Sequence, residues 1–412
     1  MAIAKYIVRC PGCAAVIHLR IGVGVDDEQA FYFVCRKCNA PTRGTQFITY
    51  SPPRSRITLE SGEALSEHLP ADQVITLHPD LPSLPHAADI RDKGGSPWLM
   101  LGQILGDRIA HFSNRLRDYR EGYSQNWPGI RRWASYYLSE DWSHFDQEAA
   151  RLWGDVWPKL PTWLDRHDFF HKSLDLVTAP LWNDDSYALM KVEWVDLVVK
   201  ATENRGATLA GFYSQSKGEV LDLQRDVFGC LDLLLSNAGA FTPALALDMC
   251  ARAGRDPEAL GMRLFRDDFP KLRDVYITTF ESCHHALFVV AGTLNVLYRG
   301  GPDNFPSGGP RGLQRFRKQK SFEKVRILSE LQVWEKQWTF LFDRRLRNAI
   351  GHHSIRHDLV SGLLVERQSE PIPYTRFIVQ VLRLVQACLV TAHLLKYVHL
   401  VPQFEAEGDA DL

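Results

Sequence analysis

The chain has 412 residues, of which 45% are hydrophobic and 24% are charged. This composition is typical of a soluble globular protein with two or three domains and a sizeable core. Its 48 basic and 49 acidic side chains leave a net charge of −1. The whole chain is therefore not attracted to nucleic acid electrostatically, and any basic surface must be local.

The cysteine usage and the apolar segments predict the compartment. The eight cysteines do not have the pattern of a secreted disulfide framework, and the N-terminal stretch MAIAKYIVRC lacks the apolar core of a signal peptide. The most apolar stretch, residues 377–395, contains Arg383 and His393, which argues against a membrane span. We expect a cytoplasmic protein that does not contact a membrane.

Residues 1–50 contain two C-x2-C pairs at the spacing of a zinc ribbon. The cysteines are Cys10, Cys13, Cys35 and Cys38, with 21 residues between the two pairs. Alternating apolar residues predict strands at 6–9, 16–21 and 31–34. Four thiolates are the typical ligand set of a structural Zn²⁺ ion, which has no open position for water, so a redox or catalytic role fits less well. We predict a small β zinc ribbon that folds when it binds Zn²⁺.

The next two segments differ in composition. Residues 51–96 are rich in proline and predict a linker with one short strand at 73–77. Residues 97–265 predict a helical middle domain, and nine of the eleven tryptophans lie between Trp98 and Trp194. Arginines alternate with these aromatic residues, which fits a single-stranded nucleic-acid platform. An aromatic core with a solvated basic face is the interpretation that we favour.

Residues 266–402 predict a bundle of long helices. A strongly apolar segment, 276–298, predicts a buried helix, and its Cys283-His284-His285 run is more typical of inter-helix contacts than of a metal site. We predict a helix at 321–351, a hairpin at 359–367 and a last helix from Thr375 to about residue 400, followed by a disordered acidic tail at 403–412. A basic run precedes the 321–351 helix and either follows a phosphate backbone or forms a solvated face. It includes Arg311, Arg315, Arg317, Lys318, Lys320, Lys324 and Arg326.

The stretch 341–358, LFDRRLRNAIGHHSIRHD, is unusually rich in arginine and histidine. Within it Arg347 is followed by the polar Asn348 and, five positions later, by His352. A guanidinium binds phosphate with a planar fork of donors, and an imidazole transfers protons near neutral pH. The spacing alone is weak, because chance yields about one such match and Arg166 with His171 forms a second. A basic helix C-terminus that complements the macrodipole is the alternative.

This motif resembles the R-x4-6-H signature of HEPN-domain ribonucleases from prokaryotic abortive-infection and toxin systems. The resemblance implies a C-terminal HEPN-like bundle and a homodimer that cleaves RNA without a metal ion, by attack of the 2′-hydroxyl to leave a cyclic phosphate. It implies that His352 transfers a proton, that Arg347 binds the phosphate and that Asn348 orients one of them. An antitoxin or a defence partner protein would accompany such an enzyme. The supporting RNA-binding candidates are His353, Arg344, Arg345, Arg356, Arg315, Arg317, Lys318 and Lys320.

A second class of function remains open. The chain could be a non-catalytic scaffold or sensor that binds nucleic acid or protein, in which the arginines and histidines only hold phosphate. The fold class that we predict is the same in both cases. It is mainly α, with a small β zinc ribbon at the N-terminus, an aromatic-rich helical middle and a helical C-terminal bundle.

Overall fold

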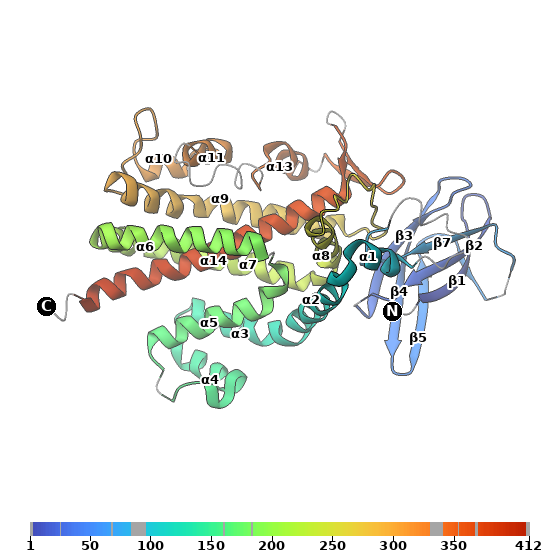
Figure 1. Ribbon diagram of the computed structural model, residues 1–412, viewed down its shortest axis with the longest axis horizontal. Coiled ribbons are helices and arrows are strands. Elements are labelled where there is room, and N and C mark those ends of the chain that lie inside the picture. The colour runs from blue at the N-terminus through green and yellow to red at the C-terminus, as the bar shows by residue number, and fades with distance from the viewer. Residues whose placement is uncertain are drawn as a thin grey trace. The chain divides into compact units, whose positions relative to one another are not determined.

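The computed structural model in Figure 1 describes residues 3–24, 26–66, 69–83, 96–159, 161–182, 184–329, 341–352, 354–366 and 370–408. The side chains of 184–194, 329, 344, 399 and 403–408 are not described. The chain forms two compact units, each built from three separate segments. Unit 1 comprises Met1–Arg120, Asn237–Asp274 and Ala349–Leu382, and unit 2 comprises Glu121–Ser236, Val275–Asn348 and Arg383–Leu412. The predicted consecutive domains divide the chain differently.

Unit 1 begins with two small β-sheets. Their strands are β1 (Ile3–Arg9), β2 (Val16–Gly22), β3 (Glu28–Val34), β4 (Pro41–Tyr50), β5 (Pro53–Leu59), β6 (Glu63–Leu65) and β7 (Gln73–Leu77). The sheets have the orders β6-β1-β2-β7 and β3-β4-β5, and only the pairing of β2 with β7 is parallel. Alternate residues of both sheets, including Ile17, Leu19, Phe31 and Phe33, form one buried apolar cluster. The strands predicted around the cysteines are confirmed.

The prediction of a linker at 51–96 was wrong for the residues before 84. Strands β5, β6 and β7 lie in it and complete the two sheets, and β7 has the predicted bounds. Ile75 and Leu77 of β7 belong to the apolar cluster. Proline is tolerated at the start of an edge strand, which is where Pro53 lies in β5. Residues 84–95 lie outside the described ranges.

The rest of unit 1 joins distant segments of the chain. It contains the helices α1 (Pro97–Leu105), η2 (Gly106–Arg108), α2 (Ile109–Glu121, which ends one residue into unit 2) and α8 (Ala238–Arg252), and the strands β8 (Arg356–Asp358), β9 (Leu363–Val365) and β10 (Ile372–Pro373). Strands β8 and β9 form the predicted hairpin. Asp267 accepts hydrogen bonds from Arg43 of β4 at 2.8 Å and from His357 of β8 at 2.9 Å. The cysteine-bearing sheets therefore pack into a larger unit and are not a separate ribbon of 50 residues.

Unit 2 is helical, in agreement with the predicted fold class (Figure 1). Its first helices are η3 (Gly122–Asn126), α3 (Trp127–Leu138), α4 (Trp142–Trp153), η4 (Gly154–Val156), α5 (Trp163–Thr178) and η5 (Ala179–Leu181). Trp133 is fully buried and stacks on Phe145, with ring centroids 4.5 Å apart. Tyr137 stacks on Phe170 at 4.0 Å. These aromatic side chains form a core, which is the interpretation that the sequence favoured.

Seven further helices belong to the described part of unit 2. They are α6 (Asp184–Gln215), α7 (Lys217–Ser236), α9 (Phe269–Arg299, which begins in unit 1), α10 (Leu313–Arg317), α11 (Ser321–Ser329), α13 (Arg344–Gly351) and α14 (Tyr374–Gly408, which also begins in unit 1). Cys230 of α7 donates a hydrogen bond to Ser282 of α9, and Cys283 of α9 approaches the carbonyl oxygen of Leu384 of α14. The buried helix predicted at 276–298 is confirmed as part of α9.

The single helix predicted at 321–351 was wrong. Helix α11 ends at Ser329, and α13 begins only at Arg344, after a break at Phe342 and Asp343. The Asp343 carboxylate accepts hydrogen bonds from the backbone N–H groups of Arg345 and Leu346 at 2.9 and 3.0 Å. An aspartate that caps a new helix in this way competes with continuation of the preceding one. Residues 330–340 lie outside the described ranges.

The last helix is longer than predicted. Helix α14 starts at Tyr374, one residue before the predicted Thr375 cap, and continues to Gly408, so the prediction of a disordered tail was wrong for residues 403–408. Within the described residues, the segment Tyr374–Pro402 is the single helix long and apolar enough to cross a membrane, and 83% of its apolar window is buried inside the protein. Such burial is typical of a core helix.

Candidate functional site

The four predicted cysteine ligands converge in unit 1. The Sγ atoms of Cys10 and Cys38 lie 3.6 Å apart, those of Cys13 and Cys35 lie 3.7 Å apart, and all four lie within 4.8 Å of one another. Tetrahedral Zn²⁺ with bonds of about 2.3 Å requires sulfur atoms about 3.8 Å apart. The cluster is therefore a metal-binding arrangement of thiols.

Local backbone geometry places these thiols. Each C-x2-C pair forms the turn of its own hairpin, and the two turns repeat the same pattern. Cys10 and Cys35 each donate an N–H to the alanine five positions later, and each accepts at its carbonyl the N–H of the residue four positions later. Those fourth residues, Ala14 and Asn39, have φ angles of 55° and 58°. The left-handed conformation turns each chain back so that both cysteines of a pair face the same point.

Gln73 of β7 supports the second turn. Its amide Nε2 donates to the Cys35 sulfur at 3.2 Å, and its Oε1 accepts the N–H of Arg36 at 3.0 Å. Burial opposes ionisation of Cys35, but the Gln73 hydrogen bond and backbone hydrogen bonds lower its pKa to about 6. A thiolate is the form that binds a metal ion, so Gln73 assists the cluster.

A second candidate site lies in unit 2 around Arg347. The Arg347 guanidinium donates to Glu281 of α9 through Nε at 3.0 Å and through Nη2 at 2.5 Å. Arg347 and Asn348 line a cavity of about 400 Å³ together with groups from α9 and from the start of α11. The other described lining residues are Phe280, Glu281, His284, Lys320, Ser321, Phe322 and Glu323. The predicted phosphate-binding arginine therefore faces a recess that also holds an ammonium group and an imidazole.

His284 is the histidine of this cavity, and the sequence analysis assigned it only to inter-helix contacts. Its Nδ1 lies 3.9 Å from Glu281, and its buried Nε2 has no hydrogen-bond partner among the described residues. Burial, with a further contribution from the cation of Lys324, lowers the pKa of His284 to about 4. The imidazole is therefore neutral at pH 7 and able to accept a proton.

Glu281, His284 and His285 also place ligand atoms within 4.8 Å of one another. The charges around them oppose a bound cation. Arg347 already neutralises Glu281, and the buried Lys324 ammonium contacts the backbone carbonyl of His284 at 3.4 Å. An imidazole between two cations is better suited to contact an anion than a metal ion.

The other predicted residues of the 341–358 stretch are distributed differently. His352 is exposed in the turn after α13, and the described lining of the Arg347 cavity does not include it. Arg345 and Arg356 are exposed as well. His357 is buried against Asp267 and is a structural residue. His353 and the side chain of Arg344 lie outside what the structure describes.

The basic run before α11 divides into three groups. Arg311, Arg315 and Arg326 line a cavity of about 610 Å³, whose only described acidic side chain is Glu323. Lys318 and Lys320 are exposed, and Lys320 lines the Arg347 cavity. Arg317 forms an ion pair with Glu219, and Lys324 is buried. The side chains of the first two groups present positive charge to solvent, as predicted. Arg317 and Lys324 instead make contacts within the protein.

The second R-x4-H match is not a comparable site. Arg166 binds Asp146 through Nε and Nη2 at 2.9 and 2.7 Å. His171 is buried and contacts the ring of Phe170. Both residues are thus part of the aromatic core of unit 2.

Comparison with known protein families, curated proteins and solved structures returns no match to this chain.

Proposed function

We propose that this protein is a metal-independent endoribonuclease of the HEPN type, and that the Arg347 cavity holds the RNA phosphate. The observation that carries the proposal is that Arg347, Asn348, Lys320 and His284 line one cavity. Two cations bind and stabilise a phosphate as charge develops on it, and a neutral imidazole accepts a proton from the attacking 2′-hydroxyl. The products are a cyclic phosphate and a 5′-hydroxyl. His352, exposed after α13, is the second candidate for proton transfer, to the leaving 5′-oxygen.

The surroundings of the cavity favour RNA as the ligand. Phe322 is 57% exposed and lines the cavity together with Lys320. An exposed ring next to cations is suited to stack an unpaired base. The neighbouring cavity with Arg311, Arg315 and Arg326 offers further positive charge to the backbone.

Substrate must displace Glu281 from Arg347. The side chains of the pair are 39% and 32% exposed. A partly exposed pair contributes about 1 kcal/mol or less, so a phosphate can replace the carboxylate. Glu281 would then be free to hold His284, whose Nδ1 it already approaches.

The proposal extends to the setting of the enzyme. A homodimer, a role in antiviral defence or as a toxin, and an antitoxin or defence partner follow from the HEPN resemblance, whereas a cytoplasmic location follows from the cysteine usage and the apolar segments. A structural Zn²⁺ ion in the cysteine cluster follows from the four thiols and their spacing.

The decisive experiment compares neighbouring histidines. We expect His284→Gln to reduce cleavage of labelled single-stranded RNA about 10²- to 10⁴-fold in the presence of EDTA. His285→Gln is the matched control, because His285 is more exposed and does not line the cavity. His352→Ala tests the motif histidine in the same assay, and Arg347→Gln tests the phosphate contact. Full activity of the His284→Gln, His352→Ala and Arg347→Gln variants would contradict the proposal. Loss of cleavage by the unaltered protein in EDTA, while its fold persists, would contradict it as well.

The second candidate function is non-catalytic RNA binding, which the arginine-lined cavity favours. It predicts that the combined change of Arg311, Arg315 and Arg326 to Gln abolishes RNA binding, while His284→Gln and His352→Ala leave binding and the RNA intact. Gel-shift measurements report RNA binding by each variant. The amount of intact RNA recovered from each mixture reports whether cleavage has occurred, and the two measurements together distinguish the two functions.

A further inference from the structure

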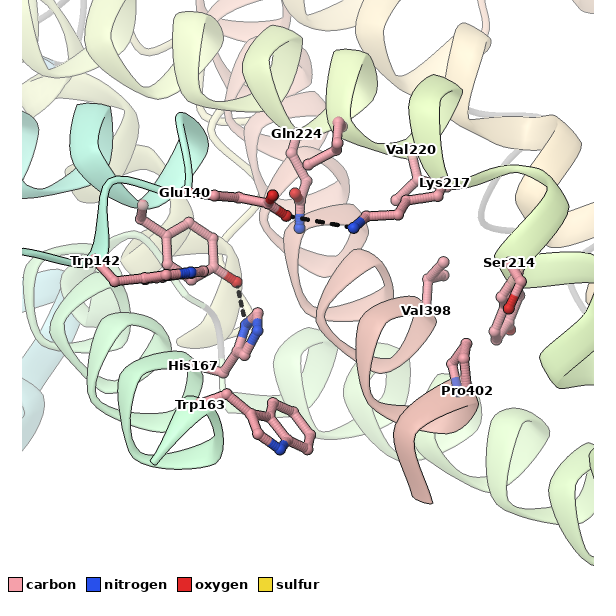
Figure 2. Close-up of a pocket in the computed structure, with 13 residues that line it drawn as sticks. Glu140, Trp142, Trp163, His167, Ser214, Lys217, Val220, Gln224, Val398 and Pro402 are labelled. Atoms are coloured by element: carbon pink, nitrogen blue, oxygen red, sulfur yellow. Dashed lines mark hydrogen bonds and ion pairs between the residues drawn. The ribbon is translucent and has the colours of Figure 1, made fainter. Parts of the chain in front are cut away.

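A third cavity, of about 300 Å³, lies in unit 2 and is lined by the helices α3, α4, α5, α6, α7 and α14 and by the turn after α3 (Figure 2). Trp142 of α4 and Trp163 and His167 of α5 lie on one side, and Val398 and Pro402 of α14 lie opposite. None of its residues lines the Arg347 cavity. It is therefore a separate site, and its role does not depend on the proposed ribonuclease activity.

Aromatic rings form its wall. Trp142 and Trp163 are partly exposed, whereas Tyr137 is buried and donates or accepts a 2.5 Å hydrogen bond with Nδ1 of His167. That bond orients the imidazole, which also contacts the Trp163 ring edge to face at 5.5 Å between centroids. Rings that are partly exposed and held in place by packing are ready to stack on a flat ligand.

The charges in the cavity balance. The Glu140 carboxylate and the Lys217 ammonium form an ion pair at 3.5 Å across its upper side (Figure 2). The buried Gln224 amide points toward this pair. A cavity with paired charges, an amide and aromatic walls suits a neutral polar ring better than an ion. A cationic ligand is further disfavoured because Arg166 already lies over the Trp142 ring at 5.5 Å.

We propose that this cavity binds the base of a nucleoside. The volume accommodates one heteroaromatic ring system and excludes a folded macromolecule. The indoles stack on the base, and the Gln224 amide lines the same cavity, where it adds polar character. Lys217 and Ser214 line the cavity on exposed positions, where they contact the sugar or an attached phosphate.

The test is calorimetric titration of the full chain with adenosine, guanosine, cytidine and uridine. We expect saturable binding of adenosine, weakened about 5- to 100-fold by Trp163→Ala. Ser214→Trp should fill the cavity with an indole and prevent adenosine from binding. Because Ser214 is exposed, this change does not remove a packed side chain. Leu164→Ala is the matched control, since Leu164 is the next residue on α5, is exposed and does not line the cavity. It should bind adenosine like the unaltered chain.

Three results overturn the proposal. The first is that no nucleoside binds in the millimolar range. The second is that adenosine binds equally well after Ser214→Trp, which would place it elsewhere. The third is that choline binds in this cavity and excludes adenosine, which would define a site for ammonium ions. Circular dichroism of each variant confirms that the helices are retained.

Discussion

Gln73 shows how one side chain outside a ligand set can support it. It contacts both the Cys35 sulfur and the backbone of the second cysteine turn. The sequence analysis predicted the four cysteines from their spacing but not Gln73, because a hydrogen-bond partner from a distant strand has no spacing rule. The position of His284 in a cavity was not predicted, for the same reason. Only the tertiary contacts bring Arg347 into the same cavity as His284.

Replacing Gln73 tests this support. We expect Gln73→Ala to weaken metal binding at the cysteine cluster about 10- to 100-fold, because Cys35 loses a hydrogen bond that favours its thiolate. Competition with a chromogenic chelator measures the affinity. Lys37→Ala is the control, since it preserves the backbone of the same turn. Equal affinities for both variants would show that Gln73 is not a supporting residue.

His284 predicts a pH dependence of stability. Its pKa is about 4 in the folded protein against an ordinary 6.5, so the unfolded chain binds the proton more tightly. Stability is therefore highest above pH 6.5 and is lost as the pH falls toward 4, by about 1–3 kcal/mol from this residue. Urea unfolding at neutral pH and at about pH 4.5 should show a smaller acid loss in His284→Gln than in His285→Gln. A loss of the same size in both variants would contradict the assignment.

At the scale of elements, the aromatic helices of unit 2 form one packed group. Trp133 of α3 stacks on Phe145 of α4, contacts Phe170 of α5 and donates its indole N–H to the backbone oxygen of Phe145 at 3.0 Å. Periodicity predicted helices here and composition predicted an aromatic core. The break before α13 was not predicted, because a single capping carboxylate at Asp343 outweighs a continuous apolar pattern.

Truncating Trp133 should destabilise this group strongly. We expect Trp133→Ala to lower the free energy of unfolding by about 3–5 kcal/mol, because it leaves a cavity in the aromatic core and removes the hydrogen bond from the indole to the Phe145 carbonyl. Chemical denaturation followed by circular dichroism measures the change. Val156→Ala changes a side chain that is 67% exposed and should stay within about 0.5 kcal/mol. A small effect at Trp133 would mean that the helices do not share one core.

At the scale of the whole molecule, each compact unit is built from three separate segments of the chain. The cysteine-bearing sheets are stabilised in unit 1 by their own apolar cluster and by segments near residues 264 and 357. Contacts other than the cysteine cluster therefore stabilise unit 1, and a metal ion held by the thiols would not be its sole source of folding free energy.

Removing the metal ion should consequently have a local effect. We expect a strong chelator to increase hydrogen exchange in β1–β4, where the cysteine turns lie, and to leave the α3–α5 helices of unit 2 protected. Exchange followed by mass spectrometry resolves the two regions. Global loss of protection would instead indicate that the whole chain depends on the metal, and unchanged exchange in β1–β4 would indicate that the thiols hold none.

The sequence by itself determined the thiol cluster, the strands around it and the helical class, because C-x2-C spacing, alternation and helical periodicity are local patterns. Arg347 and Asn348 were also identified from a local motif. Only the tertiary structure decided that Glu281, 66 residues earlier, binds Arg347 and that His284 shares its cavity. It also decided that Gln73 donates a hydrogen bond to Cys35 and that the tryptophan-bearing helices line a cavity. The physical reason is that packing between distant helices depends on the shapes and charges of all their side chains at once, which no short stretch of sequence contains.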